Sequence, residues 1–480
     1  MNRDDASVKA YQNKSVVFRF RGKDYSLVLS HGLFSSAGID SGTRLLLKVL
    51  SHVWDEDMRR DRPLPRKVLD AGCGAGIIGI AAAGALAAES SGRISVRCQD
   101  RDELARAFTA YNARANGIPP SLLESYCEPL LAGPSGAAWD LILSNIPAKA
   151  GRPVLEDFIS RSAALLEPGG KVIIVIVNPI ADICRAWITE AGLDLTAEES
   201  GAEHTVFVFT AESRRKKEAL PPPSRSPVLP GPVRTGLSFF DNFPFYRRAS
   251  NNFELEHIPY HIDAVYGAAD FDSPGGTVYD AAKLAVKINL ARKLGASAAA
   301  PPFPADFPLL IHEPDQGHFS AWLLRFLFLE GIHPSGVILS GRNILALEAS
   351  RRNTMNAAEE TIQDETRRPK VSTVPAADLA IYGQLLLEAL EEKEKKGYAF
   401  IAAAPETVPK TERLDSLWEG AEKLLAPGGI IFMGFSSSEA ERFDRKKTKG
   451  FTRLGDIKRK GFRVLAYQKH FSPGFLLQGN

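Results

Sequence analysis

The sequence predicts an α/β protein with two tandem domains, each built on a doubly wound, mostly parallel sheet. Three observations support this prediction. At 480 residues the chain is too long for one compact core. In the first half, short apolar strands alternate with helical segments, which is typical of a parallel sheet with helices on both faces. Several stretches of the first half also recur, in the same order, in the second half.

The alternation in the first half can be followed element by element. The turn GCGAG at Gly72–Gly76 separates the first strand from an Ala-rich helix. The expected strands are Lys67–Asp70, Ile94–Cys98, Leu141–Ser144, Lys171–Val177 and Thr205–Thr210, and the further helices are Arg101–Asn116, Pro153–Leu166 and Pro179–Ala191. Ligands of such sheets bind beyond the carboxyl ends of the strands, where the polar motif residues of this chain fall.

A charged and then Pro/Ser-rich stretch divides the two halves. Its composition disfavours both a helix and a central strand, so it is expected to be a semi-rigid linker. We therefore expect a first domain at residues 1–211, a linker at 212–234 and a second domain at 235–480.

The repeat indicates that only the first copy keeps its ligand chemistry. Where the first copy has LDAGCGAG, the second has IHEPDQGH, so Pro314 and Gln316 are expected where glycines would face a ligand. Where the first copy has SNIPAKAG, the second has AAAPETVP, and the Ala404 side chain cannot accept a hydrogen bond. We expect the C-terminal domain to be a degenerate copy. An independent α/β domain with another ligand is the alternative.

The amino-acid composition limits the classes of protein to which the chain could belong. A hydrophobic content of 44% and a charged content of 24% are ordinary for a soluble protein, and a net charge of +2 neither demands nor excludes nucleic acid. No apolar run reaches about 18 residues, so no membrane span is expected. The N-terminus is polar, and the four cysteines lack paired ligand spacing. We expect a cytoplasmic protein with reduced thiols and no metal site.

The glycine turn lets the backbone approach a nucleotide-like ligand closely, because a Cβ would clash or forbid the required φ and ψ. Asp100 follows the second strand, where a carboxylate can accept both ribose hydroxyls. The alternative role for Asp100 is to cap the next helix, but Asp102 is better placed for that. The G-x-G-x-G spacing differs from the G-x-G-x-x-G of dinucleotide enzymes.

Together with Asn145-x-Pro147, that spacing is typical of class I S-adenosylmethionine-dependent methyltransferases. Residues Ser15–Thr210 resemble the small-domain (MTS) family of these enzymes, which includes the guanine-N2 methyltransferases of 16S and 23S rRNA. The resemblance rests on Phe34-Ser35, Asp40-x-Gly42-Thr43, the turn, Asp100, Ala115–Gly117 and Asp140–Gly151. Larger members of the family are also tandem duplications with one degenerate half.

The resemblance implies two tandem Rossmann-like methyltransferase domains and S-adenosylmethionine as cofactor. Asp70 would orient the amino group of the cofactor, or else cap the turn. Glu128, after the third strand, would accept from the adenine amino group, or else be a solvated loop acid. The cofactor-binding residues implied are Asp70, Gly72, Gly74, Gly76, Asp100, Glu128 and Asn145, and the catalytic residues are Asn145 and Pro147.

The implied reaction is methylation of an exocyclic amino group of guanine in rRNA, with rRNA or a ribosomal subunit as partner. Asn145 would hold the planar amino group toward the methyl carbon. The family has Asn-Pro-Pro followed by an aromatic residue, whereas this chain has Ile146 and Ala148, and alanine cannot stack on a base. A protein or small-molecule amine as substrate, and a non-catalytic RNA-binding protein, are the alternatives. Lys149 and the basic run Asp444–Arg463 are either RNA contacts or solvated.

Overall fold

The protein is described by a computed structural model covering residues 3–34, 38–89, 93–133, 139–212, 239–270, 273–299, 307–383, 397–406, 408 and 412–470. It divides into two compact units, Met1–Tyr246 and Arg247–Asn480. Apart from residue 212, the expected linker lies outside the described residues. Phe239–Tyr246, which we expected at the start of the second domain, belongs to the first unit. There the rings of Phe243 and Phe245 lie 5.2 and 5.0 Å from the guanidinium of Arg161.

The first unit begins with a helix and a β-hairpin and continues as an alternation of strands and helices. Its elements are α1 (Arg3–Tyr11), β1 (Gln12–Phe20), β2 (Lys23–Ser30), α2 (Ser41–Arg59), β3 (Lys67–Ala71), α3 (Ile77–Glu89), β4 (Ser95–Asp100), α4 (Glu103–Ala115), β5 (Leu123–Cys127), β6 (Trp139–Asn145), α5 (Arg152–Ser162), β7 (Leu166–Val177), α6 (Ala181–Glu190), β8 (Asp194–Ser200), β9 (His204–Thr210) and α8 (Phe239–Asn242). Every strand and helix named from the sequence is present, but β7 begins at Leu166 instead of Lys171 and α5 ends at Ser162 instead of Leu166.

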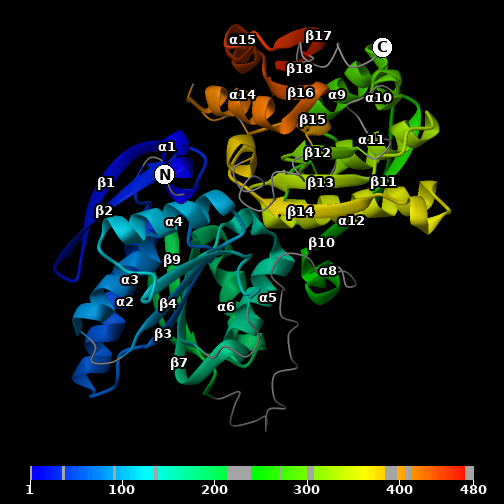
Figure 1. Cartoon of the computed structure of the whole chain (residues 1–480). Helices are drawn as coiled ribbons and strands as arrows, with labels where there is room; N and C mark the ends of the chain where they lie inside the picture. The colour runs from blue at the N-terminus through cyan, green and yellow to red at the C-terminus, as the bar shows by residue number, and fades with distance from the viewer. Residues whose placement is uncertain are drawn as a thin grey trace. The chain divides into compact units, whose positions relative to one another are not determined.

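Seven strands of this unit form one sheet in the order β5-β4-β3-β6-β7-β9-β8. The strands from β5 to β7 are parallel, whereas β9 runs antiparallel to both of its neighbours. Figure 1 shows this sheet between α5 and α6 on one face and α2, α3 and α4 on the other. The predicted doubly wound, mostly parallel architecture is confirmed.

The second unit repeats the first. Its elements are β10 (Arg247–Leu255), β11 (Ile258–Val265), α9 (Gly276–Lys287), α10 (Leu290–Ala299), β12 (Pro308–His312), α11 (His318–Leu329), β13 (Gly336–Gly341), α12 (Ile344–Thr361), β14 (Lys370–Pro375), β15 (Tyr398–Ala403), α14 (Glu412–Leu424), β16 (Leu425–Ser436), α15 (Ser437–Arg445), β17 (Phe451–Arg459) and β18 (Phe462–Lys469). Its sheet order, β14-β13-β12-β15-β16-β18-β17, matches the first strand for strand. Each hairpin even has a register shift near its start, at Gln12/Lys14 and at Arg247/Ala249.

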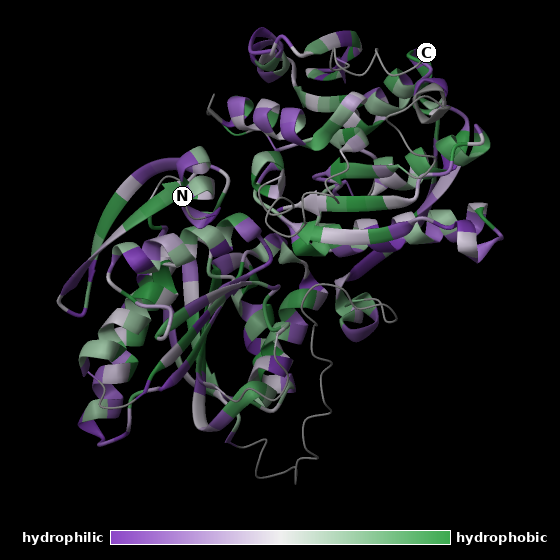
Figure 2. Cartoon of the chain, in the orientation of Figure 1, coloured by the Kyte–Doolittle hydropathy of each residue, from purple (hydrophilic) through white to green (hydrophobic). Residues whose placement is uncertain are grey.

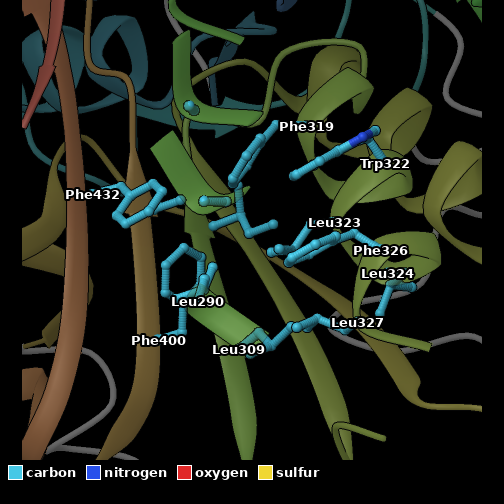
Figure 3. Packing of buried hydrophobic residues seen from close by; sticks show 14 of the residues in the cluster. Leu290, Leu309, Phe319, Trp322, Leu323, Leu324, Phe326, Leu327, Phe400 and Phe432 are labelled. Carbon is cyan, nitrogen blue, oxygen red and sulfur yellow. The ribbon is translucent and has the colours of Figure 1, made fainter. Parts of the chain in front are cut away.

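Each unit buries its own hydrophobic core. The central strands are mostly in the hydrophobic colour in Figure 2, whereas the hydrophilic colour gathers on outer helices and hairpins. In the second unit, Phe319 and Phe326 of α11 belong to the same buried cluster as Phe400 and Phe432 of the sheet (Figure 3). Trp322 and Phe326 stack at 5.1 Å with their planes 6° apart. No helix of the described residues is long and apolar enough to cross a membrane.

One buried asparagine in each unit joins the hairpin, the first turn of the sheet and a helix. In the first unit, Asn112 Nδ2 donates to the carbonyls of Val28 and Ala75, and its Oδ1 accepts from the Val28 N–H at 2.8 Å. In the second, Asn353 makes the same three bonds, to Asp263 and Gln316. Both side chains are fully buried. The two copies are therefore assembled around the same polar contact.

These contacts correct the residue correspondence in the glycine turn. The Gly72 N–H donates to the Gln99 carbonyl at 2.8 Å, and the Glu313 N–H donates to the Ser340 carbonyl at 2.7 Å. Glu313 thus stands at the position of Gly72, and Asp315 at that of Gly74. The expectation that Pro314 and Gln316 replace the ligand-facing glycines was wrong by one residue, because strand pairing with β13 sets the register.

The second copy keeps the turn conformation without two of the glycines. Gly72, Gly74 and Gly76 have φ of +81°, +56° and +86°. Their counterparts, Glu313, Asp315 and Gly317, have φ of +56°, +51° and +90°. A left-handed residue other than glycine costs about 1–2 kcal/mol. The surrounding contacts therefore hold the turn in this shape.

We predict that Asn112→Ala and Asn353→Ala each destabilise their own unit by about 3 kcal/mol, because one N–H and two carbonyls lose their partners inside the protein. Thermal unfolding followed by calorimetry measures the effect, as a shift of roughly 10 °C in one of two transitions. Asn116→Ala is the matched control, since the bonds of Asn116 to Ser26 lie at the surface, where water replaces the lost partner, and the Asn112 carbonyl keeps its bond from the Asn116 N–H. An effect of Asn112→Ala no larger than that of Asn116→Ala would contradict the prediction.

Candidate cofactor and catalytic site

The predicted site residues meet at the carboxyl edge of three adjacent strands. β3 ends at Ala71, β4 at Asp100 and β6 at Asn145. Because β3 lies between β4 and β6 and runs parallel to both, these ends lie side by side. The turn Gly72–Gly76 begins where β3 ends, and it is closed by the Gly76 N–H, which donates to the Cys73 carbonyl at 2.9 Å.

The three glycines of the turn differ in what surrounds them. A Cβ added at Gly74 would meet nothing within 4 Å, and one at Gly72 would meet only the ends of Leu130 and Ser144, at 3.7 and 4.0 Å. A Cβ at Gly76 would lie 2.9–3.0 Å from Ile80 and Thr109. Gly72 and Gly74 therefore border open space, whereas Gly76 lets helix α4 pack against the turn.

Asp70 is fully buried beneath the turn. Its Oδ2 accepts from the Gly79 N–H at 2.8 Å, which caps the start of α3. Its Oδ1 is buried and has no hydrogen-bond partner among the described residues. Burial, with a further contribution from the nearby Asp100, raises the pKa of Asp70 to about 7. Asp70 thus performs the capping role and still offers one acceptor.

Asp100 joins the end of β4 to the turn. Its carboxylate accepts from the Gly74 N–H and from the Asp102 N–H, each at 3.0 Å. Burial raises the pKa of Asp100, and the neighbouring Asp102 raises it further. The cap of α4 is Asp102, whose Oδ1 accepts from the Leu104 N–H at 2.8 Å. The preference for Asp102 as the cap is confirmed, and Asp100 lies directly against the glycine turn.

Glu128 is partly buried and forms an ion pair. Its carboxylate pairs with Arg97 Nη2 at 2.7 Å, and that guanidinium lies 3.6 Å from the centre of the Tyr126 ring. Arg97 Nε also donates to Gln99 Oε1 at 2.7 Å. Sequence reasoning missed this network, for which the only signal was a charged residue in the middle of the strand VRCQD.

Asn145 ends β6 and faces the first turn of α2. Its Nδ2 donates to Asp40 Oδ1 at 3.2 Å and to Thr43 Oγ1 at 3.0 Å. Asp40 is the N-cap of α2, accepting from the Thr43 N–H at 2.9 Å and from Thr43 Oγ1 at 2.8 Å. The motif Asp40-x-Gly42-Thr43 therefore contacts the predicted catalytic asparagine, a link that sequence reasoning did not make.

The residues after Asn145 divide between the core and the surface. Ile146 is 3% exposed and packs in the core cluster of this unit. Pro147, Ala148 and Lys149 are exposed. The isoleucine at position 146 is therefore explained by its packing in the core. The rim of the site is formed by small or flexible side chains. Ser35, part of the resembling motif, lies outside the described residues.

The residues present fit S-adenosylmethionine on two observations. The backbone at Gly72 and Gly74 borders open space that side chains would fill. Two residues before Gly72 stands Asp70, whose Oδ1 atom is buried and has no partner among the described residues, which suits the positively charged amino group of the cofactor. Among the described residues, no group of three or more His, Cys, Asp or Glu side chains could hold a metal ion.

Comparison with known proteins agrees with this geometry. The fold of the whole chain matches that of the T. thermophilus 16S rRNA N2 G1207 methyltransferase, with a TM-score of 0.56, 16% identity and coverage of 98% of this chain and 100% of that one. The ribosomal RNA small subunit methyltransferase C of Chromohalobacter salexigens is 32% identical over 177 residues, which is 36% of this chain and 47% of that protein. That match therefore spans about half of the relative.

Two further matches assign the family. The profile of the methyltransferase small domain matches residues 24–183. The uncharacterized protein YbxB of Bacillus subtilis is 31% identical over 160 residues, which is 33% of this chain and 72% of that protein. The chain belongs to the methyltransferase small-domain family of S-adenosylmethionine-dependent methyltransferases.

Proposed function

We propose that this methyltransferase acts on the exocyclic amino group of a guanine in ribosomal RNA. The observation that carries the proposal is the Asn145 amide. Its NH₂ group is bound by Asp40 and Thr43, which leaves Oδ1 to accept from a planar amino group. It lies at the same strand edge as the glycine turn, where the cofactor would bind.

The chemistry follows from what these residues can hold. S-adenosylmethionine, when bound, supplies a methyl carbon attached to a positively charged sulfur. The open backbone at Gly72 and Gly74 would receive it, with Asp70 toward its amino group and Asp100 toward its ribose. Asn145 Oδ1 accepts an N–H of the substrate amino group and so turns the nitrogen lone pair toward the methyl carbon. Pro147, with φ of −68°, restricts Ile146 to an extended conformation beside it.

The surroundings of Asn145 support a polyanionic substrate. Lys149 is exposed on the rim of the site. Arg44 lies on the exposed side of α2, which carries Asp40, and borders two hollows of about 250 and 360 Å³, where Lys48 is paired with Glu199 at 2.6 Å. Cations in this position can neutralise backbone phosphates. Several relatives are named as small-subunit rRNA methyltransferases, which supports the same assignment, whereas others are named as ribosomal protein L11 methyltransferases.

A second candidate is an amine of a protein or small molecule. Ala148 favours it, because the residue that would stack on a base has no ring. Methyl transfer from labelled S-adenosylmethionine to ribosomes of a deletion strain separates the two, since RNase and protease remove the label from different substrates.

We predict labelled N2-methylguanine in rRNA from the deletion strain and no labelling of wild-type rRNA, whose site is already methylated. Asn145→Ala should lower this transfer by about 100-fold, because a mispositioned amino group loses the advantage of orientation. The Kd for S-adenosylhomocysteine should change by much less. Label in protein alone, or a modified nucleoside other than N2-methylguanine, would refute the rRNA assignment.

We predict that calorimetry finds one S-adenosylhomocysteine per chain. Asp100→Ala should weaken binding by at least about tenfold, since it removes a charge-assisted acceptor. Asp315→Ala is the matched control, because Asp315 lies in the corresponding turn of the second copy and should leave binding unchanged. A stoichiometry of two, or equal weakening by both substitutions, would contradict the prediction.

The pKa of Asp70 predicts a pH dependence of cofactor binding. A carboxyl with a pKa of about 7 is mostly protonated at pH 6 and mostly charged at pH 8. A positively charged amino group binds the charged form, so affinity should fall by about tenfold from pH 8 to pH 6. Calorimetry of S-adenosylhomocysteine binding at both pH values measures this.

Asp70→Asn should bind weakly at both pH values, and Asp315→Asn should keep the wild-type pH dependence. Burial also raises the pKa of Asp315 to about 7, so it controls for a general effect of pH. An affinity that stays constant or rises as the pH falls would exclude the role of Asp70.

A further inference from the structure

The amide of Asn145 can act on a substrate only if its oxygen, and not its nitrogen, faces the amino group. The two ends of an asparagine amide have nearly the same shape, and rotation by 180° exchanges them. Their contacts must therefore select the orientation. Asn145 ends a strand and is only partly buried, so packing alone does not distinguish the two ends.

We propose that Asp40 and Thr43 are positioning residues that fix the orientation of the Asn145 amide. This inference rests on the proposed function and deepens it. The Asp40 carboxylate can only accept, and its Oδ1 lies 3.2 Å from Asn145 Nδ2. A rotated amide would place its own oxygen there, so that two acceptors would face each other without a hydrogen between them.

Thr43 favours the same orientation of the Asn145 amide. Its hydroxyl proton is donated to Asp40 Oδ2 at 2.8 Å, so its oxygen can only accept from Asn145, which it does at 3.0 Å. Both hydrogens of the Asn145 NH₂ group are then used. Among the described residues no donor meets Asn145 Oδ1, which leaves that atom for the substrate.

The helix keeps both residues in place. Asp40 caps α2, where a carboxylate is favoured by the helix dipole, and α2 packs against β7 and β9. Gly42 between them has no room for a side chain. An added Cβ would lie 2.8 Å from His204 Cδ2 and 3.1 Å from Asp40 Oδ1. The spacing Asp-x-Gly-Thr is thus explained residue by residue.

The second copy supports the pairing of these residues independently. The N-cap of α9 is Gly275, which makes no side-chain cap bond, and Val278 follows it at the position of Thr43. At the position of Asn145, set by strand pairing, stands Ala404. The copy that lacks the asparagine therefore also lacks both residues that orient it.

Three variants test the role. Thr43→Val removes the hydroxyl at nearly constant volume, and Thr43→Ser keeps it. We expect Thr43→Val to lower kcat by 10-fold or more, with KM for rRNA and the Kd for S-adenosylhomocysteine within threefold of wild type. Thr43→Ser should have a kcat within threefold of wild type.

Asp40→Ser keeps a helix cap, but the serine side chain is too short to reach Asn145. It should keep the wild-type unfolding temperature within a few degrees and lose kcat as Thr43→Val does.

A readout independent of activity separates this inference from the proposed function. The side-chain NH₂ signal of Asn145 in an NMR spectrum of ¹⁵N-Asn-labelled protein is identified by its absence in Asn145→Ala. Thr43→Val should shift one of its two protons and speed its exchange with water, whereas Thr43→Ser should not. Equal kcat, or equal NMR signals, for Thr43→Val and Thr43→Ser would overturn the inference. A wild-type protein without rRNA methylation but with the expected NMR difference would overturn only the proposed substrate.

Discussion

The first unit depends on one buried amide, that of Asn112. It satisfies the backbone of β2 on one side and the glycine turn on the other, so one fully buried side chain of α4 contacts both the hairpin and the turn. Its counterpart Asn353 does the same in the second unit. Inside a protein an unpaired amide or carbonyl is costly, and this makes the arrangement difficult to change without loss of stability. That constraint explains why the turn kept its shape in both copies after their ligand-facing residues diverged.

The comparison of the two turns separates the tasks of the three glycines. The glycine is retained in both copies, as Gly76 and Gly317, and a Cβ there would lie 3.0 Å or less from Thr109 of α4 or Ser350 of α12. Gly72 and Gly74 became Glu313 and Asp315, yet the backbone remains left-handed. The carboxylates offset the strain with new bonds, from the Arg342 N–H at 3.0 Å and the Ala269 N–H at 2.9 Å. Glycine at 72 and 74 is thus needed for open space rather than for the turn, which argues for a ligand there.

The fold could be predicted from the sequence because its signals are local. Apolar strands, helix caps and the glycine turn each depend on neighbouring residues, and the repeat appears as two series of such signals in the same order. The residue correspondence of the second turn could not be predicted from the sequence. An alignment of the two stretches ignores the strand pairing, which gives Glu313 the position that Gly72 has in the first unit. The contacts of Glu128 with Arg97 and of Asn145 with Asp40 join residues 31 and 105 positions apart. No local pattern predicts which distant side chain will meet such a residue.

The electrostatics of the site also follow from its place in the fold. Asp70 is buried and Asp100 is half-buried at the ends of adjacent strands, and removal from water raises the pKa of both carboxyls, with a further rise from Asp100 for Asp70 and from Asp102 for Asp100. Two such carboxyls are unfavourable in an empty protein, but they suit a ligand that has positive charge on both its amino group and its sulfur. In the second copy Ile311 stands at the position of Asp70 and Gly341 at that of Asp100. There the Glu313 carboxylate lies over Gly341, 3.0 Å from where a Cβ would be. In the second copy, the Glu313 side chain therefore occupies the space that stays open beside the turn in the first copy.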